Sequence, residues 1–168
     1  ESAKVLETGD FAALEKRILD ILDSDARIPV VQKLGPWYYN FWRDAKNPRG
    51  LWRRTTLAEY RKDQPAWATA IALAALRAAE NETRLWHGAA CLKPDYRRCL
   101  VQLSRGGADA DVVREFDLEA RAFVKDGFFL PEAKSWGTGW LDPDTLYVST
   151  DFGPGSMTTS GYPRVAKV

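Results

Sequence analysis

The sequence is poor in the residues that build catalytic and metal sites. It has one histidine, His87, two cysteines, Cys91 and Cys99, and one methionine. A Ser–His–acid or Cys–His arrangement would have to use His87. The order of His87, Cys91 and Cys99 does not fit a standard zinc pattern. Two cysteines are also too few for a disulfide scaffold.

Strong charge and long apolar runs are absent as well. The net charge is +1, so no long-range field is expected to attract nucleic acid or an anionic membrane. No apolar run approaches the ~20 residues of a membrane helix. Residues 1–10 have neither the basic flank nor the apolar stretch of a signal peptide. With two cysteines expected to be reduced, these absences favour a cytoplasmic location.

The chain does contain enough apolar surface for one folded domain, with 45% apolar and 12% aromatic residues. Apolar residues three or four apart predict an amphipathic helix over 10–23, with Asp10 as its N-cap. A helix this short must dock on something else to persist. Aromatic runs on both sides of the turn-forming residues 47–50 predict a hairpin over 37–56.

Residues 67–80 are ambiguous. Their alanines favour a helix, most clearly over 73–79, whereas 67–71 fit either a strand or a helix. From residue 85 onward the pattern predicts strands, with two short strands joined at 119–120 and a long exposed loop from Asp151 to Pro163. The predicted strands cover 85–92, 98–104, 110–118, 135–141, 146–150 and 164–168.

One pattern occurs twice. Residues 88–95 align with 137–144 at an offset of 49, and both segments read Gly, then Leu-x-Pro-Asp, then a returning strand. Proline fixes φ and aspartate bonds its own backbone, so each segment predicts a strand, a turn and a second strand. A multi-stranded unit repeated at this spacing is typical of propeller blades.

No motif in the chain supplies a catalytic, cofactor-binding or metal-ligating residue. The serines lack a Gly-x-Ser-x-Gly elbow, and His87 is expected to be structural or at the surface. The segment 105–109 predicts a turn between strands, because it lacks the spacing of a phosphate loop. If Leu92 pairs with Cys99, Cys91 and Cys99 are diagonal neighbours, so two buried free thiols are expected rather than a disulfide.

The hairpin over 37–56 carries the densest mixture of basic and aromatic residues. Such a mixture can bind single-stranded nucleic acid by stacking and phosphate contacts, which is kept as a minority hypothesis. A hairpin with one packed aromatic face and one solvated cationic face is favoured, and no nucleic-acid partner is expected. The basic residues are Arg43, Lys46, Arg49, Arg53 and Arg54, and the aromatic ones are Tyr38, Tyr39, Phe41, Trp42 and Trp52.

Several longer strings are similar to the prolyl oligopeptidase family of serine peptidases, at the start of its N-terminal β-propeller. They include VQKLGPWYYNFWRDAKNPRGLWRRTTLAEY, LSRGGADADVVREFDLE, FFLPEAKS and WLDPDTLYVSTDFGPGSMTTSGYPRVAKV. The resemblance implies a mainly β fold with an N-terminal helix, forming about two to three blades of a seven-bladed ring. It implies a helical lead-in over 1–34 and incomplete propeller blades over 35–168. The alanines of 67–80 depart from the family pattern and put the expected blade strand there in doubt.

The resemblance also implies that this chain has a function but contributes no catalytic residues. Family members join the propeller to an α/β-hydrolase domain that carries the Ser, Asp and His triad, and they cleave short peptides. The propeller restricts substrates by size, so this chain is expected to gate access and to be inactive alone, with no cofactor. No hydrolase motif is present, so no catalytic residue is assigned to any position.

Two further expectations concern the chain by itself. A partial ring leaves a blade face and a strand edge without a partner, which predicts self-association or a rearranged, non-propeller β fold. The alternative function is therefore a stand-alone β-rich interaction module that associates through its unpaired blade edges.

Overall fold

The computed structural model describes residues 10–24, 26–135 and 137–168. Its three helices within these ranges are α2 (Phe11–Leu22), α3 (Leu57–Tyr60) and α4 (Leu73–Glu80). The strands are β1 (Gln32–Leu34), β2 (Trp37–Trp42), β3 (Leu51–Thr55), β4 (Ala68–Ala72), β5 (Arg84–Cys91), β6 (Arg98–Arg105), β7 (Ala110–Asp117), β8 (Ala122–Phe123), β9 (Phe129–Lys134), β10 (Gly137–Asp142) and β11 (Thr145–Ser149).

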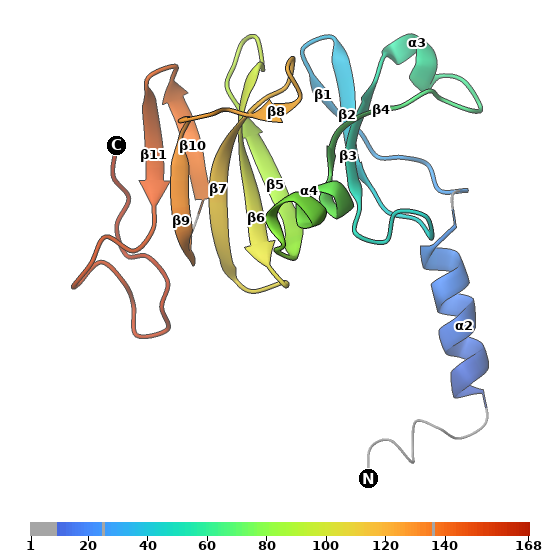
Figure 1. Ribbon diagram of the computed structural model, residues 1–168, viewed down its shortest axis with the longest axis horizontal. Coiled ribbons are helices and arrows are strands. Elements are labelled where there is room, and N and C mark those ends of the chain that lie inside the picture. The colour runs from blue at the N-terminus through green and yellow to red at the C-terminus, as the bar shows by residue number, and fades with distance from the viewer. Residues whose placement is uncertain (1–9, 25, 136) are drawn as a thin grey trace.

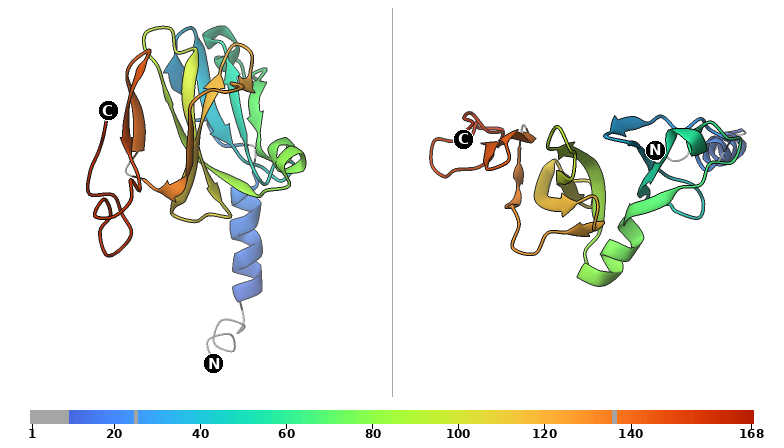
Figure 2. Two further views of the ribbon diagram at one scale, coloured as in Figure 1. Left: turned by 60° about the vertical axis from the view of Figure 1, so that its left-hand side comes forward. Right: turned by 90° about the horizontal axis from the view of Figure 1, so that it is seen from above.

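The strands form three antiparallel sheets that follow one another along the chain. The first sheet has the order β1-β2-β3-β4, the second has β5-β6-β7 with β8 and β9 both on β7, and the third is β10-β11. The sheets stand side by side in Figure 1, and the view from above in Figure 2 shows them fanning out from one another. This is how the first strands of a propeller are laid out, one sheet after another.

The predicted repeat coincides with the first hairpins of two successive sheets. Residues 88–95 run from β5 into the turn before β6, and residues 137–144 form β10 and the turn before β11. The hairpin predicted over 37–56 is also confirmed, since β2 pairs with β3 from Tyr38–Thr55 to Trp42–Leu51.

Residues 67–80 divide into a strand and a helix. Ala68–Ala72 form β4, the outer strand of the first sheet, and Leu73–Glu80 form α4. The doubt about a blade strand here was therefore wrong for 68–72. Pairing with β3 and the burial of Ala70 and Ile71 outweigh the helix propensity of alanine.

The N-terminal helix is confirmed as Phe11–Leu22, but Asp10 does not cap it as predicted. Asp10 stands at the N-cap position with ψ near 1°, outside the extended region, and its side chain makes no capping hydrogen bond. Figure 1 shows α2 projecting away from the sheets, and none of its side chains is buried. Its apolar stripe is therefore left uncovered in this chain.

The core lies between the first and second sheets, and a group of aromatic rings packs within its aliphatic residues. Trp52 on β3 lies 4.9 Å from Trp86 on β5 and 6.1 Å from Phe116 on β7, measured between ring centroids. Tyr39 and Phe41 on β2 add contacts to Trp52 and Trp86 from the same face. Alternation along β2 directs Tyr38, Asn40 and Trp42 to the opposite face of the first sheet.

One strand prediction failed near the C-terminus, and one strand was missed. Residues 164–168 form no strand; a bridge between Lys167 and Val148 and a hydrogen bond from Oγ of Ser149 to the carbonyl oxygen of Val165 join them to β11. Conversely, β9 was not predicted, because Pro131 interrupts its pattern.

Candidate functional site: the seams between neighbouring sheets

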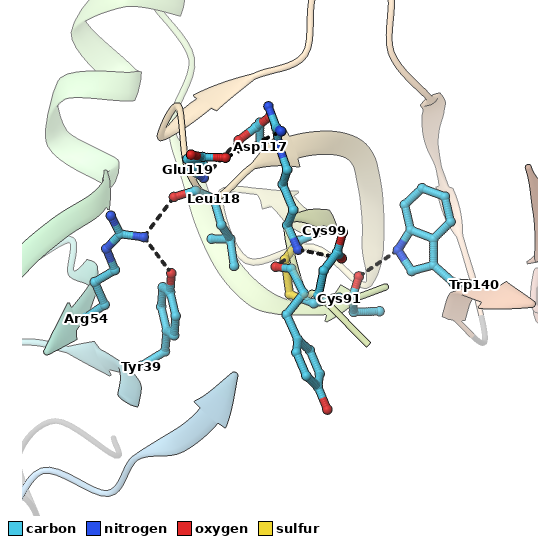
Figure 3. Close-up of a disulfide and its surroundings, with 12 residues drawn as sticks. Tyr39, Arg54, Cys91, Cys99, Asp117, Leu118, Glu119 and Trp140 are labelled. Carbon is cyan, nitrogen blue, oxygen red and sulfur yellow. Dashed lines mark hydrogen bonds and ion pairs between the residues drawn. A yellow bond between two sulfur atoms is a disulfide. The ribbon is translucent and has the colours of Figure 1, made fainter. Parts of the chain in front are cut away.

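Arg54 closes the first seam, where the first and second sheets meet. Its Nη1 donates to the carbonyl oxygen of Leu118 at 3.0 Å and to the hydroxyl of Tyr39 at 3.2 Å. Its guanidinium lies 4.4 Å from the ring centroid of Trp37. Figure 3 shows Arg54 directed from β3 toward Leu118, which follows β7. One side chain thus joins two sheets through a backbone acceptor 64 residues away.

The surroundings of Arg54 are largely buried. Burial raises the pKa of Tyr39, and the hydrogen bond and charge of Arg54 oppose that rise only in part. Nε of Arg54 is buried without a hydrogen-bond partner. The seam widens here into a hollow of about 520 Å³ lined by Trp37, Tyr96 and Arg97 among others. The hydrogen bonds of Arg54 therefore join the two sheets at the edge of a seam whose interior is apolar.

The second seam, between the second and third sheets, is bridged by contacts of Trp140 and Arg98. Nε1 of Trp140 on β10 donates to the carbonyl oxygen of Ala90 on β5 at 3.1 Å, as drawn in Figure 3. Arg98 on β6 lies 4.6 Å from the Trp140 ring and donates to the carbonyl oxygen of Pro143 at 2.8 Å. The third sheet is therefore attached to the second by an indole and a guanidinium.

Glu115 holds Arg98 in place for this contact. Its Oε1 accepts from Nε of Arg98 at 2.6 Å, and its Oε2 accepts from the backbone N–H of Phe128 at 3.0 Å. Burial of the carboxylate raises its pKa, but these two bonds outweigh burial, and the pKa of Glu115 lies below its usual value. Glu115 is therefore a charged, hydrogen-bonded anchor at neutral pH.

The two cysteines form a disulfide, which corrects the expectation of free thiols. Cys91 on β5 and Cys99 on β6 are directly opposite, with Cα atoms 4.0 Å apart and the sulfurs bonded. The expected register was wrong by one residue, because Leu92 bonds to Arg98 rather than pairing with Cys99. Figure 3 shows the disulfide, which links β5 to β6, between Arg54 of the first seam and Trp140 of the second.

His87 belongs to a polar network in the second sheet. Its Nε2 lies 3.1 Å from Oγ of Ser104 on β6, and its Nδ1 lies 2.8 Å from Oδ1 of Asp111 on β7. These residue types match a catalytic triad, but Ser104 is completely buried, so no substrate carbonyl can reach its hydroxyl. His87, predicted to be structural or at the surface, has a side chain that is 36% exposed and is hydrogen-bonded within the second sheet.

Comparison with known proteins identifies this arrangement. The family model described as "Prolyl oligopeptidase, N-terminal beta-propeller domain" matches residues 5–168. The chain belongs to this family. The predicted mainly β fold, a partial propeller with an N-terminal helix, is thereby confirmed.

The relatives are peptidases several times longer than this chain. An uncharacterized peptidase, y4nA, of Sinorhizobium fredii (strain NBRC 101917 / NGR234) is 50% identical over 129 residues, which cover 77% of this chain and 18% of the relative. An uncharacterized peptidase, RP174, of Rickettsia prowazekii (strain Madrid E) is 36% identical over 135 residues, covering 76% and 19%. The chain thus spans about a fifth of these relatives.

A solved structure shows the same fold. The structure of a post-proline cleaving enzyme from Rickettsia typhi superposes with a TM-score of 0.84 at 31% identity, covering 96% of this chain and 24% of that one. In the parent enzymes of this family the propeller packs with a catalytic domain.

Two other features singled out in the sequence can now be placed. The segment 105–109 is the turn between β6 and β7, as predicted. Of the hairpin aromatics, Trp42 and Trp52 are buried on the first sheet, which leaves little of either ring exposed to stack on bases. Within residues 10–24, 26–135 and 137–168, no three His, Cys, Asp or Glu side chains are grouped as a metal site. The same residues include no helix that is long and apolar enough to cross a membrane.

Proposed function

We propose that this chain forms part of the wall of a propeller that restricts, by size, which peptides reach the catalytic domain of a prolyl-oligopeptidase-like peptidase. The match to the family's propeller domain over residues 5–168 is the observation that carries this proposal. The solved relative is described as a post-proline cleaving enzyme, which makes short, proline-containing peptides the substrate class to test. The chemistry would come from the catalytic domain, and we assign no catalytic residue here.

The two seams support the proposal because they make the wall rigid. A size filter excludes large peptides only if neighbouring blades do not part, and Arg54 and Trp140 each bond across a seam. The apolar stripe of α2 supports docking of this helix on the catalytic domain, since its exposed side chains need a cover. A division between lead-in and blades at residue 34 belongs to the same proposal, although β1 already pairs with β2.

The experiment compares two substrates in a protein that joins this chain to the remaining blades and the catalytic domain. Cleavage is measured for a short proline-containing peptide and for a peptide of about thirty residues that carries the same cleavage site. Arg54→Ala is expected to raise kcat/KM for the long peptide relative to the short one, because the first seam opens more readily. The exposed Arg61 lies in neither seam, so Arg61→Ala is the control. An unchanged ratio in Arg54→Ala would argue against gating by this part of the wall.

A second function is self-association of the chain as an interaction module. Large apolar side chains are exposed on α2 and around the third sheet, among them Ile18, Leu22, Leu141 and Tyr147. Burying them between copies would remove apolar surface from water. Light scattering across a concentration series tests this, and a constant monomer mass would exclude it.

The cellular location stays a proposal. Location in the cytoplasm was predicted partly from two reduced thiols, and the Cys91–Cys99 disulfide removes that support.

A further inference from the structure

Another hollow lies on the face of the first sheet that points away from the second sheet. It has a volume of about 810 Å³, and its walls come from the segment before β1, from β2 and β3, and from the loop before β4. Arg53, Trp42 and Trp67 line it, with Arg27, Asp63 and Tyr60 at other positions. Neither seam includes this hollow, and the proposed gating function does not use it.

The guanidinium of Arg53 is held between two indole rings in this hollow. Its central carbon lies 4.2 Å from the ring of Trp42 and 4.2 Å from the ring of Trp67. Arg27 lies 4.7 Å from the Trp42 ring, so a second cation adjoins the same stack. Contact with two rings leaves only the edge of a planar guanidinium for hydrogen bonding.

Part of that edge is already used. Nε of Arg53 donates to Oδ1 of Asn40 at 2.9 Å, and Asn40 is buried. This bond fixes the plane of the guanidinium and leaves Nη1 and Nη2 as a fork toward the hollow. In the described part of the chain, no hydrogen bond or ion pair from a carboxylate reaches this fork.

The nearby carboxylates do not balance the charge of Arg53 directly. Asp44 accepts from Nε1 of Trp42 at 2.8 Å and from Asn47, so its oxygens are engaged elsewhere. Asp63 lines the hollow, but no ion pair joins it to Arg53 in the described residues. Lys62 adds a positive charge, which Glu59 pairs at 2.5 Å. Burial lowers the pKa of Arg53 to about 10; the charge of Asp44 opposes this fall only in part, and the charge of Arg27 adds to it.

We propose that this hollow is a binding site for a carboxylate group, which Arg53 receives through two parallel hydrogen bonds from Nη1 and Nη2. A planar carboxylate matches the two donors of a guanidinium fork, and a partly desolvated cation strengthens such a pair. The carboxylate can come from an acidic side chain or from a peptide C-terminus, because both present the same two oxygens.

The test is a titration of the chain with sodium acetate at constant ionic strength, maintained with sodium chloride. Nuclear magnetic resonance follows the Nε–H signal of Arg53 and the indole N–H signals of Trp42 and Trp67. Saturable shifts of these three signals are expected, with smaller shifts elsewhere. If they do not move in acetate, or if chloride moves them equally, the proposal is overturned.

Variants separate a fork from a simple positive charge. Arg53→Lys keeps the charge but loses the two parallel donors, and it is expected to bind acetate about tenfold more weakly. Arg61→Lys, at an exposed arginine that does not line the hollow, is the matched control and should bind as the parent does. Equal affinity in Arg53→Lys and the parent would contradict bidentate binding.

Two further arms identify what fills the site. Asp63→Asn should leave the Arg53 signal unchanged before acetate is added; a shift would show that Asp63 itself occupies the fork and would overturn the proposal. Acetyl-glutamate amide and acetyl-alanine then distinguish a side-chain carboxylate from a C-terminal one. Saturation by either supports the site and names its source, and failure of both contradicts it.

Discussion

At the first seam, the rings of Trp52, Trp86 and Phe116 meet in a buried core, and Arg54 only closes the edge. At the second seam, the third sheet is fastened to the second by polar contacts of Trp140 and Arg98. Apolar burial is proportional to area and tolerates small displacements, whereas a hydrogen bond depends on direction. The first seam should therefore determine global stability, and the second should open locally.

The largest effect is expected from breaking the first seam. Trp52→Ala removes a side chain that is 4% exposed and should lower the free energy of unfolding by about 3–5 kcal/mol. Tyr147→Ala, at a half-exposed ring on β11, is the control and should change it by less than about 1 kcal/mol. Urea titration measures both. Equal losses would show that the two regions do not differ as the contacts imply.

The disulfide is next, because β5 borders both seams. Reduction reopens the short loop between Cys91 and Cys99 and should lower the free energy of unfolding by about 2–3 kcal/mol. The urea midpoint is compared with and without a thiol-free reductant. Cys91→Ala/Cys99→Ala is the control and should not respond to reductant. Two titratable thiols in the native, unreduced chain would contradict the disulfide.

The carboxylate of Glu115 links the second seam to pH. Because its pKa is lowered in the folded state, its contribution to stability is present above the unfolded value of 4.5 and is lost as pH falls through the folded value. Glu115→Gln should cost about 1–2 kcal/mol at pH 7 and flatten the loss of stability in acid. The pKa values of Asp44 and Asp117 are also lowered, so these two residues should retain part of the pH dependence of stability in Glu115→Gln.

Urea unfolding between pH 7 and 3 measures the effect of Glu115. The control is Glu119→Gln, at a side chain that is 76% exposed and pairs only loosely with Arg97. The proposed role of Glu115 would be refuted by identical pH profiles for the parent and Glu115→Gln.

The strands that are short apolar runs between turn residues could be predicted from the sequence, and the contacts between sheets could not. β6 and β7 were located in this way although consecutive residues are buried in both, and the repeat at 88–95 and 137–144 located two hairpins correctly. β4 was uncertain because alanine propensity is local, while its pairing with β3 is tertiary. The disulfide was missed through a one-residue slip, since register depends on how the turn after Leu92 closes.

The seam contacts were hidden for a related reason. Arg54 and Arg98 donate to backbone carbonyls 64 and 45 residues away. Because every residue has a backbone carbonyl, the sequence does not indicate which one accepts such a bond. The hollow around Arg53 was missed for the same reason. The sequence identified the basic and aromatic residues of the hairpin, but Arg53 contacts both Trp42, on the neighbouring strand, and Trp67, which lies outside the hairpin.

The smallest effect is expected from Trp140→Phe, and this variant tests most directly whether the two seams open separately. Phenylalanine retains an aromatic ring near Arg98 but loses the N–H that bonds to Ala90, which should cost about 1 kcal/mol. Because this bond is at the second seam, the loss should be local: amide hydrogen exchange should quicken in β10 and β11 and stay unchanged in β2 and β3. Uniformly faster exchange in all sheets would mean that the two seams open together, and the polar seam would then be part of the same cooperative unit as the aromatic one.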